Sequence, residues 1–175
     1  MQFLSRRSAR ACPRVRRAVF ALALAVLASP GLAQQPDEGH PFAGLPGAWA
    51  GTGTIALSNG AKERIRCRAT YRLDNDVSNL RLELSCTSDS YKFELQSQLA
   101  YDDRAISGNW NETTRGVGGM IRGSAVGSRI QARAEGQTFT AILAMNTRGP
   151  RQSVSIESPG SEMSKITIEL TRGAR

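Results

Sequence analysis

The segment 64–73 reads RIRCRATYRL and the segment 80–86 reads LRLELSC. In both segments, apolar side chains alternate with charged or hydroxyl-bearing ones. Successive side chains of an extended strand point to opposite faces, so this alternation is typical of a strand with one buried face and one face in water. Each segment therefore predicts a half-buried β-strand.

The same alternation continues along the chain. Further alternating runs lie at 91–99, 139–145 and 166–170, and no stretch after residue 44 shows sustained helical periodicity. Turn-forming residues separate the runs, and Asn59-Gly60 is the strongest hairpin signal, because a type I′ turn needs positive φ at both central residues. These features predict an all-β fold. We expect a single antiparallel up-and-down β-barrel of about nine or ten strands, closed so that no strand edge stays exposed.

Alternation alone does not tell which face of the sheet lies inside the barrel. An outer-membrane barrel also alternates, with its apolar face outward between two girdles of aromatic residues. The segment 45–175 has few aromatic residues, and its polar positions are dense in charge. Both observations favour a barrel whose apolar face is the inner one.

Cys67 and Cys86 both fall on the apolar positions of their segments. Opposed residues of a hairpin have a constant sum, so pairing these two cysteines centres the turn between Asp76 and Val77, inside the polar segment 74–79. Cross-strand neighbours have a Cα separation that a disulfide tolerates. We therefore predict a Cys67–Cys86 disulfide, which stabilises the fold by about 3 kcal/mol on the chain-entropy argument. Two buried free thiols are the alternative.

Residues 1–33 have the composition of a cleavable signal peptide. A start rich in arginine precedes the apolar run AVFALALAVLA at 18–28, and small residues lead up to Ala33. This order is that of an export signal, and the run is too short to span a bilayer as a membrane anchor would. We expect a flexible leader at 34–44, the barrel domain at 45–175, and a periplasmic or secreted location reached by the general or the twin-arginine route.

Removal of the predicted signal peptide changes the charge of the protein. The full chain has a net charge of +8, but six of its 23 basic residues and none of its 15 acidic residues lie in 1–33. The remaining 142 residues carry 17 basic against 15 acidic side chains, without a contiguous run of lysine and arginine. The sequence therefore argues against nucleic-acid binding. It also predicts no integral membrane span once the signal is cleaved.

Few residues are suited to catalysis or to metal binding. His40 is the single histidine of the chain, and it lies in the leader. A Ser-His-Asp or Cys-His arrangement needs an imidazole that the fold holds beside the nucleophile, and a histidine-based zinc site needs several spaced ligands. With both remaining cysteines paired, thiol chemistry is disfavoured too. The sequence therefore predicts no enzyme activity, no cofactor and no metal site.

The barrel interior is the expected place for a ligand. Five aromatic residues are candidates to contact it: Trp49, Tyr71, Phe93, Trp110 and Phe139. Glu112 and Arg115 fall at a strand end and turn, where a carboxylate and a guanidinium can orient a ligand at the barrel mouth; a rim salt bridge of little energetic weight is the alternative. Small residues at many positions after Ala105 fit either a filled, tapering interior or a cavity.

Gly47-Ala48-Trp49, at the start of the first expected strand, resembles the Gly-x-Trp that opens lipocalin and other calycin barrels. The resemblance implies that Trp49 packs across the closed end of the barrel. The basic cluster that lipocalins place late in the chain to meet this tryptophan is not identifiable. The pattern from GAWAGTGTIALSNG (47–60) to SGNWNETTRG (107–116) is also similar to uncharacterised exported proteins of Gram-negative bacteria.

Two functions compete at this point. The calycin-like opening favours an exported barrel that binds a small, largely apolar ligand in its interior without catalysis. The alternative is an envelope protein that binds another protein, because the chain also resembles the small periplasmic inhibitors of secreted metalloproteases. Their inhibitory part is a short N-terminal trunk, to which the leader 34–44 compares. A ligand carrier requires an internal cavity of about several hundred Å³, whereas a protein-binding barrel is expected to be filled.

Overall fold

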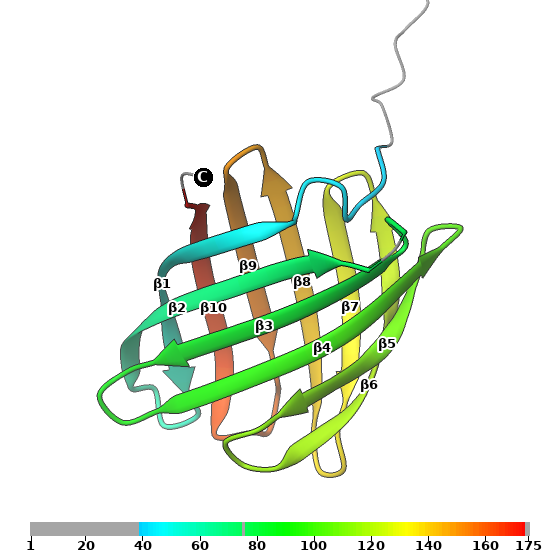
Figure 1. Ribbon diagram of the computed structural model, residues 1–175. Coiled ribbons are helices and arrows are strands. Elements are labelled where there is room, and N and C mark those ends of the chain that lie inside the picture. The colour runs from blue at the N-terminus through cyan, green and yellow to red at the C-terminus, as the bar shows by residue number, and fades with distance from the viewer. Residues whose placement is uncertain (1–38, 75, 174–175) are drawn as a thin grey trace, which may run out of the picture. The chain divides into compact units, whose positions relative to one another are not determined.

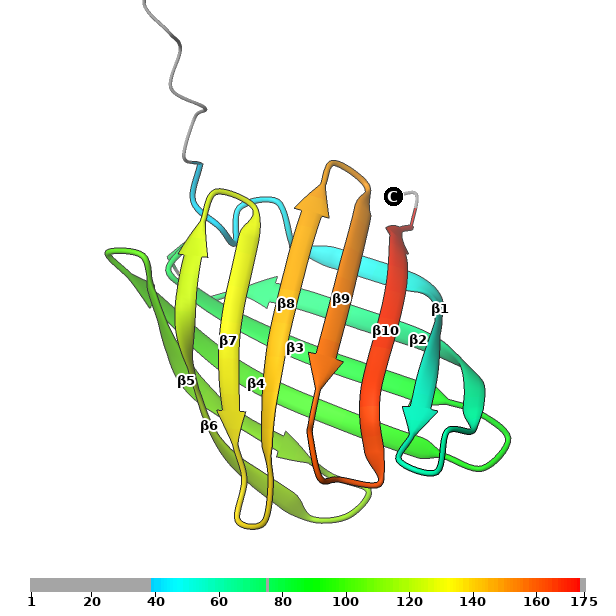
Figure 2. The ribbon, with the colours of Figure 1, turned by 180° about the vertical axis from the view of Figure 1, so that it is seen from behind.

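The computed structural model describes residues 39–74 and 76–173, which form a closed antiparallel barrel (Figures 1 and 2). Each strand pairs with the next one along the chain, and β1 pairs with β10 to complete the ring. The predicted all-β up-and-down barrel is confirmed. The ten strands are β1 (Gly47–Leu57), β2 (Lys62–Leu73), β3 (Asn79–Thr87), β4 (Lys92–Asp102), β5 (Ala105–Glu112), β6 (Val117–Val126), β7 (Arg129–Glu135), β8 (Thr140–Arg148), β9 (Arg151–Glu157) and β10 (Met163–Arg172). The predicted signal peptide 1–33 lies outside the described residues.

The apolar face of the alternating strands is the inner face of the barrel. In β2, Ile65, Cys67, Ala69 and Tyr71 are all buried, and the residues between them are exposed or half-buried. The period of two thus separates one continuous core from a polar outer surface. Among the described residues, no helix has the length and apolar character that crossing a membrane requires.

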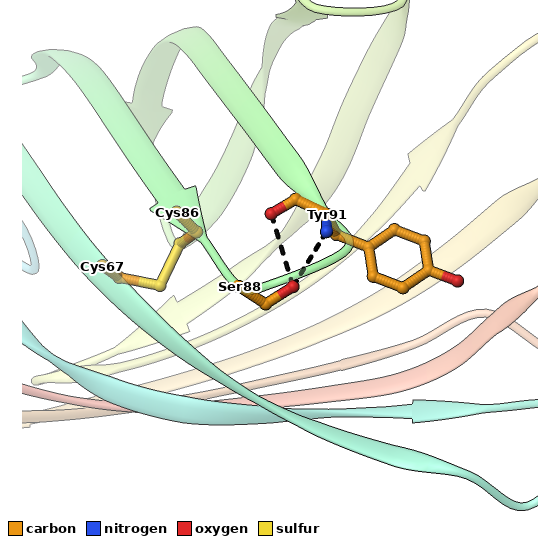
Figure 3. Close-up of a disulfide and its surroundings, with 4 residues drawn as sticks. All are labelled: Cys67, Cys86, Ser88 and Tyr91. Atoms are coloured by element: carbon orange, nitrogen blue, oxygen red, sulfur yellow. Dashed lines mark hydrogen bonds between the residues drawn. A yellow bond between two sulfur atoms is a disulfide. The ribbon is translucent and has the colours of Figure 1, made fainter.

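The Cys67–Cys86 disulfide is present, and it lies inside the barrel. The two cysteines face each other in the register of β2 and β3, with their Cα atoms 4.1 Å apart. The predicted hairpin register is therefore confirmed. Figure 3 shows the disulfide close to the β3–β4 turn, where the backbone N–H of Tyr91 donates a hydrogen bond of 2.9 Å to Oγ of Ser88.

One end of the barrel, which we call the Trp49 end, is closed by apolar side chains. Trp49 is 1 % exposed and donates a hydrogen bond of 2.8 Å from Nε1 to the carbonyl oxygen of Leu45. Leu45 and Phe42 are buried beside it. Pro41 and Phe42, in the segment expected to be a flexible leader, are thus both buried. Residues 34–38 lie outside the described part of the chain.

Arg172 is the basic partner of Trp49 that the sequence did not reveal. Its guanidinium carbon lies 4.7 Å from the centre of a Trp49 ring, as in a cation–π contact. Nη2 of Arg172 also donates a hydrogen bond to the carbonyl oxygen of Gly44. The register explains the contact, since Trp49 and Arg172 are direct partners in the β1–β10 ladder.

The interior next to the Trp49 end is filled by a short chain of buried polar groups. The Tyr71 hydroxyl donates a hydrogen bond of 2.7 Å to Oε1 of Gln152, whose Nε2 donates one of 3.1 Å to Oγ1 of Thr147. Burial raises the pKa of Tyr71 well above its ordinary value, so its hydroxyl stays protonated and acts as the donor. The side chains of Tyr71, Gln152 and Thr147 thus all have hydrogen-bond partners, as buried polar groups generally do.

Candidate functional site

A cavity of about 240 Å³ opens at the other end of the barrel, which we call the cavity end. It lies where the hairpin connections 113–116 and 136–139 and the β9–β10 connection 158–162 come together. Its wall is almost wholly apolar. The side chains that form the wall are Phe93, Leu95, Trp110, Val117, Ile121, Ala134, Phe139, Ala141, Leu143, Ile156, Met163 and Ile166.

Small inward side chains on neighbouring strands create this space. Ala134 of β7 and Ala141 of β8 face each other in the register, and both line the cavity. These two positions thus offer only methyl groups to the large side chains of β4, β5 and β9 that line the cavity. The sequence left open whether its small residues fill a taper or leave a cavity, and these two alanines leave a cavity.

Other small residues have a different cause. A Cβ atom added at Gly108, Gly119 or Gly123 would lie 2.0, 1.7 or 2.1 Å from a backbone oxygen of a neighbouring residue. Such distances are far below van der Waals contact, so no other residue fits without moving the backbone. These glycines permit the close approach of strands and add nothing to the cavity.

Three of the five predicted aromatic residues line the cavity together. Phe93, Trp110 and Phe139 contribute to its wall, and the rings of Trp110 and Phe139 lie 5.5 Å apart between their centres. Trp49 and Tyr71 do not belong to this wall and lie toward the Trp49 end. Alternation predicts which face of a strand a residue occupies, but the level along the barrel axis follows only from the register of all the strands.

Glu112 is a buried carboxylate at the mouth of the cavity. Its Oε1 accepts hydrogen bonds from the backbone N–H of Glu94 (3.0 Å) and of Thr114 (2.9 Å), and its Oε2 accepts one from the backbone N–H of Arg115 (2.8 Å). Burial raises the pKa of this carboxyl, but the hydrogen bonds from Glu94, Thr114 and Arg115 outweigh burial, so the pKa lies below its ordinary value of 4.5. Glu112 is therefore an anion that holds the β5–β6 turn in place.

Arg115 lies at the mouth as well, but more exposed. Its Nη1 is 3.6 Å from Oε2 of Glu112, and its side chain is 41 % exposed against 9 % for Glu112. At such a distance and exposure the ion pair adds little energy. The structure thus brings Glu112 and Arg115 together, as predicted. The backbone hydrogen bonds stabilise the Glu112 carboxylate more than the ion pair with Arg115 does.

The mouth contains a residue that the sequence did not reveal, Glu162. Glu162, in the β9–β10 connection, lines the cavity and accepts a hydrogen bond of 2.7 Å from the hydroxyl of Tyr91 in the β3–β4 turn. This bond raises the pKa of Tyr91. The two connections are 71 residues apart in sequence, so no local pattern reveals their contact.

Replacement of Glu112 by glutamine is expected to lower the free energy of unfolding by about 2 kcal/mol at neutral pH. In glutamine an NH2 group replaces one of the two carboxylate oxygens. This group is a donor, so it cannot accept the hydrogen bond of the backbone N–H that it faces. A carboxyl with a lowered pKa stabilises the fold above its ordinary pKa and loses this effect as the pH falls below it. Urea unfolding at a series of pH values checks this. The wild type loses stability below about pH 4.5, and a variant with an equally steep loss would contradict the role of Glu112.

The remaining titratable groups gather no metal site in the described ranges 39–74 and 76–173. His40 lies toward the Trp49 end, where its ring packs edge-on against Tyr101 at 4.7 Å and Phe42 at 5.6 Å. It is therefore not among the cavity residues. The indole Nε1 of Trp110, in contrast, is buried in the cavity wall and has no hydrogen-bond partner among the described residues.

Comparison with known proteins identifies the fold. No protein-family model matches the chain, and no curated protein sequence matches it. Among solved structures, Rv2717c from M. tuberculosis matches with a TM-score of 0.61 at 11 % identity, covering 75 % of this chain and 94 % of that one. The S-type phycobiliprotein lyase CPES from Guillardia theta matches with a TM-score of 0.50 at 10 % identity, covering 74 % and 89 %.

These likenesses and the closed ten-strand barrel fit the calycin-like fold that Gly47-Ala48-Trp49 suggests. At such low identity they show the fold alone. Because the second protein is a lyase by name, the comparison gives no support to the expectation that this chain is not an enzyme.

Proposed function

We propose that the protein binds a small, largely apolar molecule in the cavity at the cavity end of the barrel. The observation that carries the proposal is the combination of a 240 Å³ cavity with a wall of aromatic and aliphatic side chains. Ligand sites are concave, mostly apolar and supplied with a few polar groups. The volume lies just below the usual range of about 300–1,000 Å³. The occupant is therefore small, or inserts only the apolar part of a longer molecule.

One polar side chain at the mouth would orient the ligand. The Trp110 Nε1–H has no partner among the described residues, but it is buried within the wall and is not exposed to the cavity. The Arg115 guanidinium at the mouth would favour a polar or anionic end turned toward solvent. We therefore favour an apolar body with one acceptor group. The site needs no cofactor and no catalytic group in this role.

We also propose export to the periplasm or beyond. The segment 1–33 carries the signal, and the Cys67–Cys86 disulfide suits an oxidising compartment. The trunk-type inhibitor of secreted proteases has less support, because Phe42 and Leu45 of the N-terminal segment are buried against the barrel. An N-terminal trunk that acts on a partner would have to be free.

A bulky side chain in the cavity tests the proposal. Ala141→Phe places a ring in the cavity wall, whereas Ala144→Phe places the same ring on the exposed outer face of the same strand. With the uncharged fluorophore N-phenyl-1-naphthylamine as probe, we expect Ala141→Phe to weaken binding at least about tenfold, a loss of about 1.4 kcal/mol. We expect Ala144→Phe to bind like the wild type.

Native mass spectrometry of protein purified from its own host complements the fluorescence titration, since a retained molecule would be identified by its mass. If the wild type bound no apolar probe and carried no molecule from its host, the proposed function would be wrong. Equal loss of probe binding in both variants would show binding elsewhere than in the cavity.

A further inference from the structure

The outer face of β2 carries a row of four cations, Lys62, Arg64, Arg66 and Arg68, which we call the β2 row. All four side chains are exposed. They occupy alternate positions of one strand, so consecutive members lie about 7 Å apart along it. Figure 1 shows β2 in the near wall of the barrel, between β1 and β3. The sequence showed alternating arginines here but no contiguous basic run, so the row becomes a surface feature only once the strand is formed.

None of the residues paired with a member of the β2 row carries a charge. Every residue paired with a member of the row is small and uncharged: Ala56, Thr54, Thr52 and Ala50 on β1, and Thr87 and Ser85 on β3. The four cationic side chains therefore reach further from the barrel than their neighbours do. In the described part of the chain, no member of the row forms an ion pair.

Several cations elsewhere on the surface pair with a carboxylate. Arg81 lies 2.8 Å from a carboxylate oxygen of Asp74, and Lys165 lies 2.7 Å from one of Glu157. Arg72, which continues the outer face of β2 beyond Thr70, pairs with Glu83 at 3.3 Å. Arg122 and Arg133, and Arg148 and Arg151, also face each other across ladders. The β2 row differs in that four cations follow one another along a single strand, and an external anion would relieve the repulsion between them.

We propose that the β2 row is a docking surface for the phosphate headgroups of an anionic lipid bilayer. The row places four protruding charges on one side of the barrel, where a flat anionic surface can meet them together. Guanidinium groups bind phosphate oxygens through two parallel hydrogen bonds. The faces around the row offer neither the aromatic platforms that stack nucleic-acid bases nor the large apolar anchors of a protein interface. Docking is therefore electrostatic and peripheral, and it does not depend on the proposed function of the cavity.

Vesicle binding tests the proposal with residues 34–175, which contain the ten strands and the core of the described part of the chain. The test variant is Arg64→Gln/Arg66→Gln/Arg68→Gln. The control, Arg122→Gln/Arg129→Gln/Arg151→Gln, removes the same charge from exposed positions on three other strands. Co-sedimentation is measured with phosphatidylglycerol–phosphatidylcholine vesicles and with pure phosphatidylcholine vesicles, and circular dichroism checks that each variant is folded.

The wild type is expected to bind only the anionic vesicles, and to release them as salt is raised. Each charge near an anionic surface is worth about fivefold in binding, so the test variant should lose about a hundredfold and the control less than tenfold. Equal losses in the two variants would mean that vesicle binding depends only on the net charge of the protein, which would overturn the proposal. So would the absence of vesicle binding, or tighter binding of duplex DNA than of vesicles at the same salt concentration.

Discussion

Replacement of Trp49 by alanine is expected to lower the free energy of unfolding by about 4 kcal/mol, in the middle of the range that the loss of a buried aromatic side chain costs. Trp49 is 1 % exposed, and its indole fills the Trp49 end of the barrel between Leu45 and Arg172. The substitution also leaves the carbonyl oxygen of Leu45 without its donor. Urea denaturation checks the change in free energy, and thermal unfolding should show a midpoint about 10–15 °C lower.

Trp49→Phe is the matched control for this prediction. It keeps an aromatic ring at the closed end but removes the Nε1 donor, so we expect about half of the loss. If Trp49→Ala cost less than about 1 kcal/mol, as an exposed position does, then Trp49 would not close the barrel. If Trp49→Phe cost as much as Trp49→Ala, the hydrogen bond to Leu45 would carry the whole effect.

Much of this fold follows from the alternation in the sequence, because the period of two is a local property. The segment 64–73 repeats it over its whole length, and its inner face in the structure is the apolar face of the sequence. The pairing of Cys67 with Cys86 could be predicted equally well, since one hairpin fixes which residues oppose each other. Both features depend only on neighbours along one strand or one hairpin.

The site was harder to predict from the sequence, because it depends on which residues of different strands lie at the same height along the barrel axis. Phe93, Trp110 and Phe139 come together in the cavity wall, but Tyr71 has the same alternation and bonds to Gln152 instead. The contact of Glu162 with Tyr91 likewise joins two connections that are distant in sequence. Which residues of distant strands come into contact depends on the register of all the strand pairs around the barrel.

Arg172 shows a further limit of the sequence. A basic residue near the end of the chain has no local signature that sets it apart from the other arginines, so its contact with Trp49 was not anticipated. The closing ladder between β1 and β10 supplies the missing information, because Arg172 is the direct partner of Trp49 in it. Ring closure is a property of the whole chain, and it places the first and last strands together.

The same closing ladder leads to the second prediction of large effect. Gly51→Ala is expected to lower the free energy of unfolding by about 4 kcal/mol, beyond the usual 1–3 kcal/mol of overpacking, because the clash involves backbone rather than a movable side chain. An added Cβ would lie 1.9 Å from the backbone oxygen of Glu169 in β10. Relief requires β1 and β10 to separate at the seam that closes the barrel. Urea denaturation and amide hydrogen exchange of β1 and β10 measure the effect.

Gly44→Ala provides the control, since nothing lies within 4 Å of the Cβ it adds and its backbone lies outside the left-handed region. We expect its free energy of unfolding to stay within about 0.5 kcal/mol of the wild type. Faster exchange in Gly51→Ala should be confined at first to β1 and β10, because the other strand pairs keep their partners. A uniform increase over all ten strands would instead mean that the seam opens only with global unfolding. A Gly51→Ala variant as stable as Gly44→Ala would show that the seam widens without cost, contrary to the close packing inferred here.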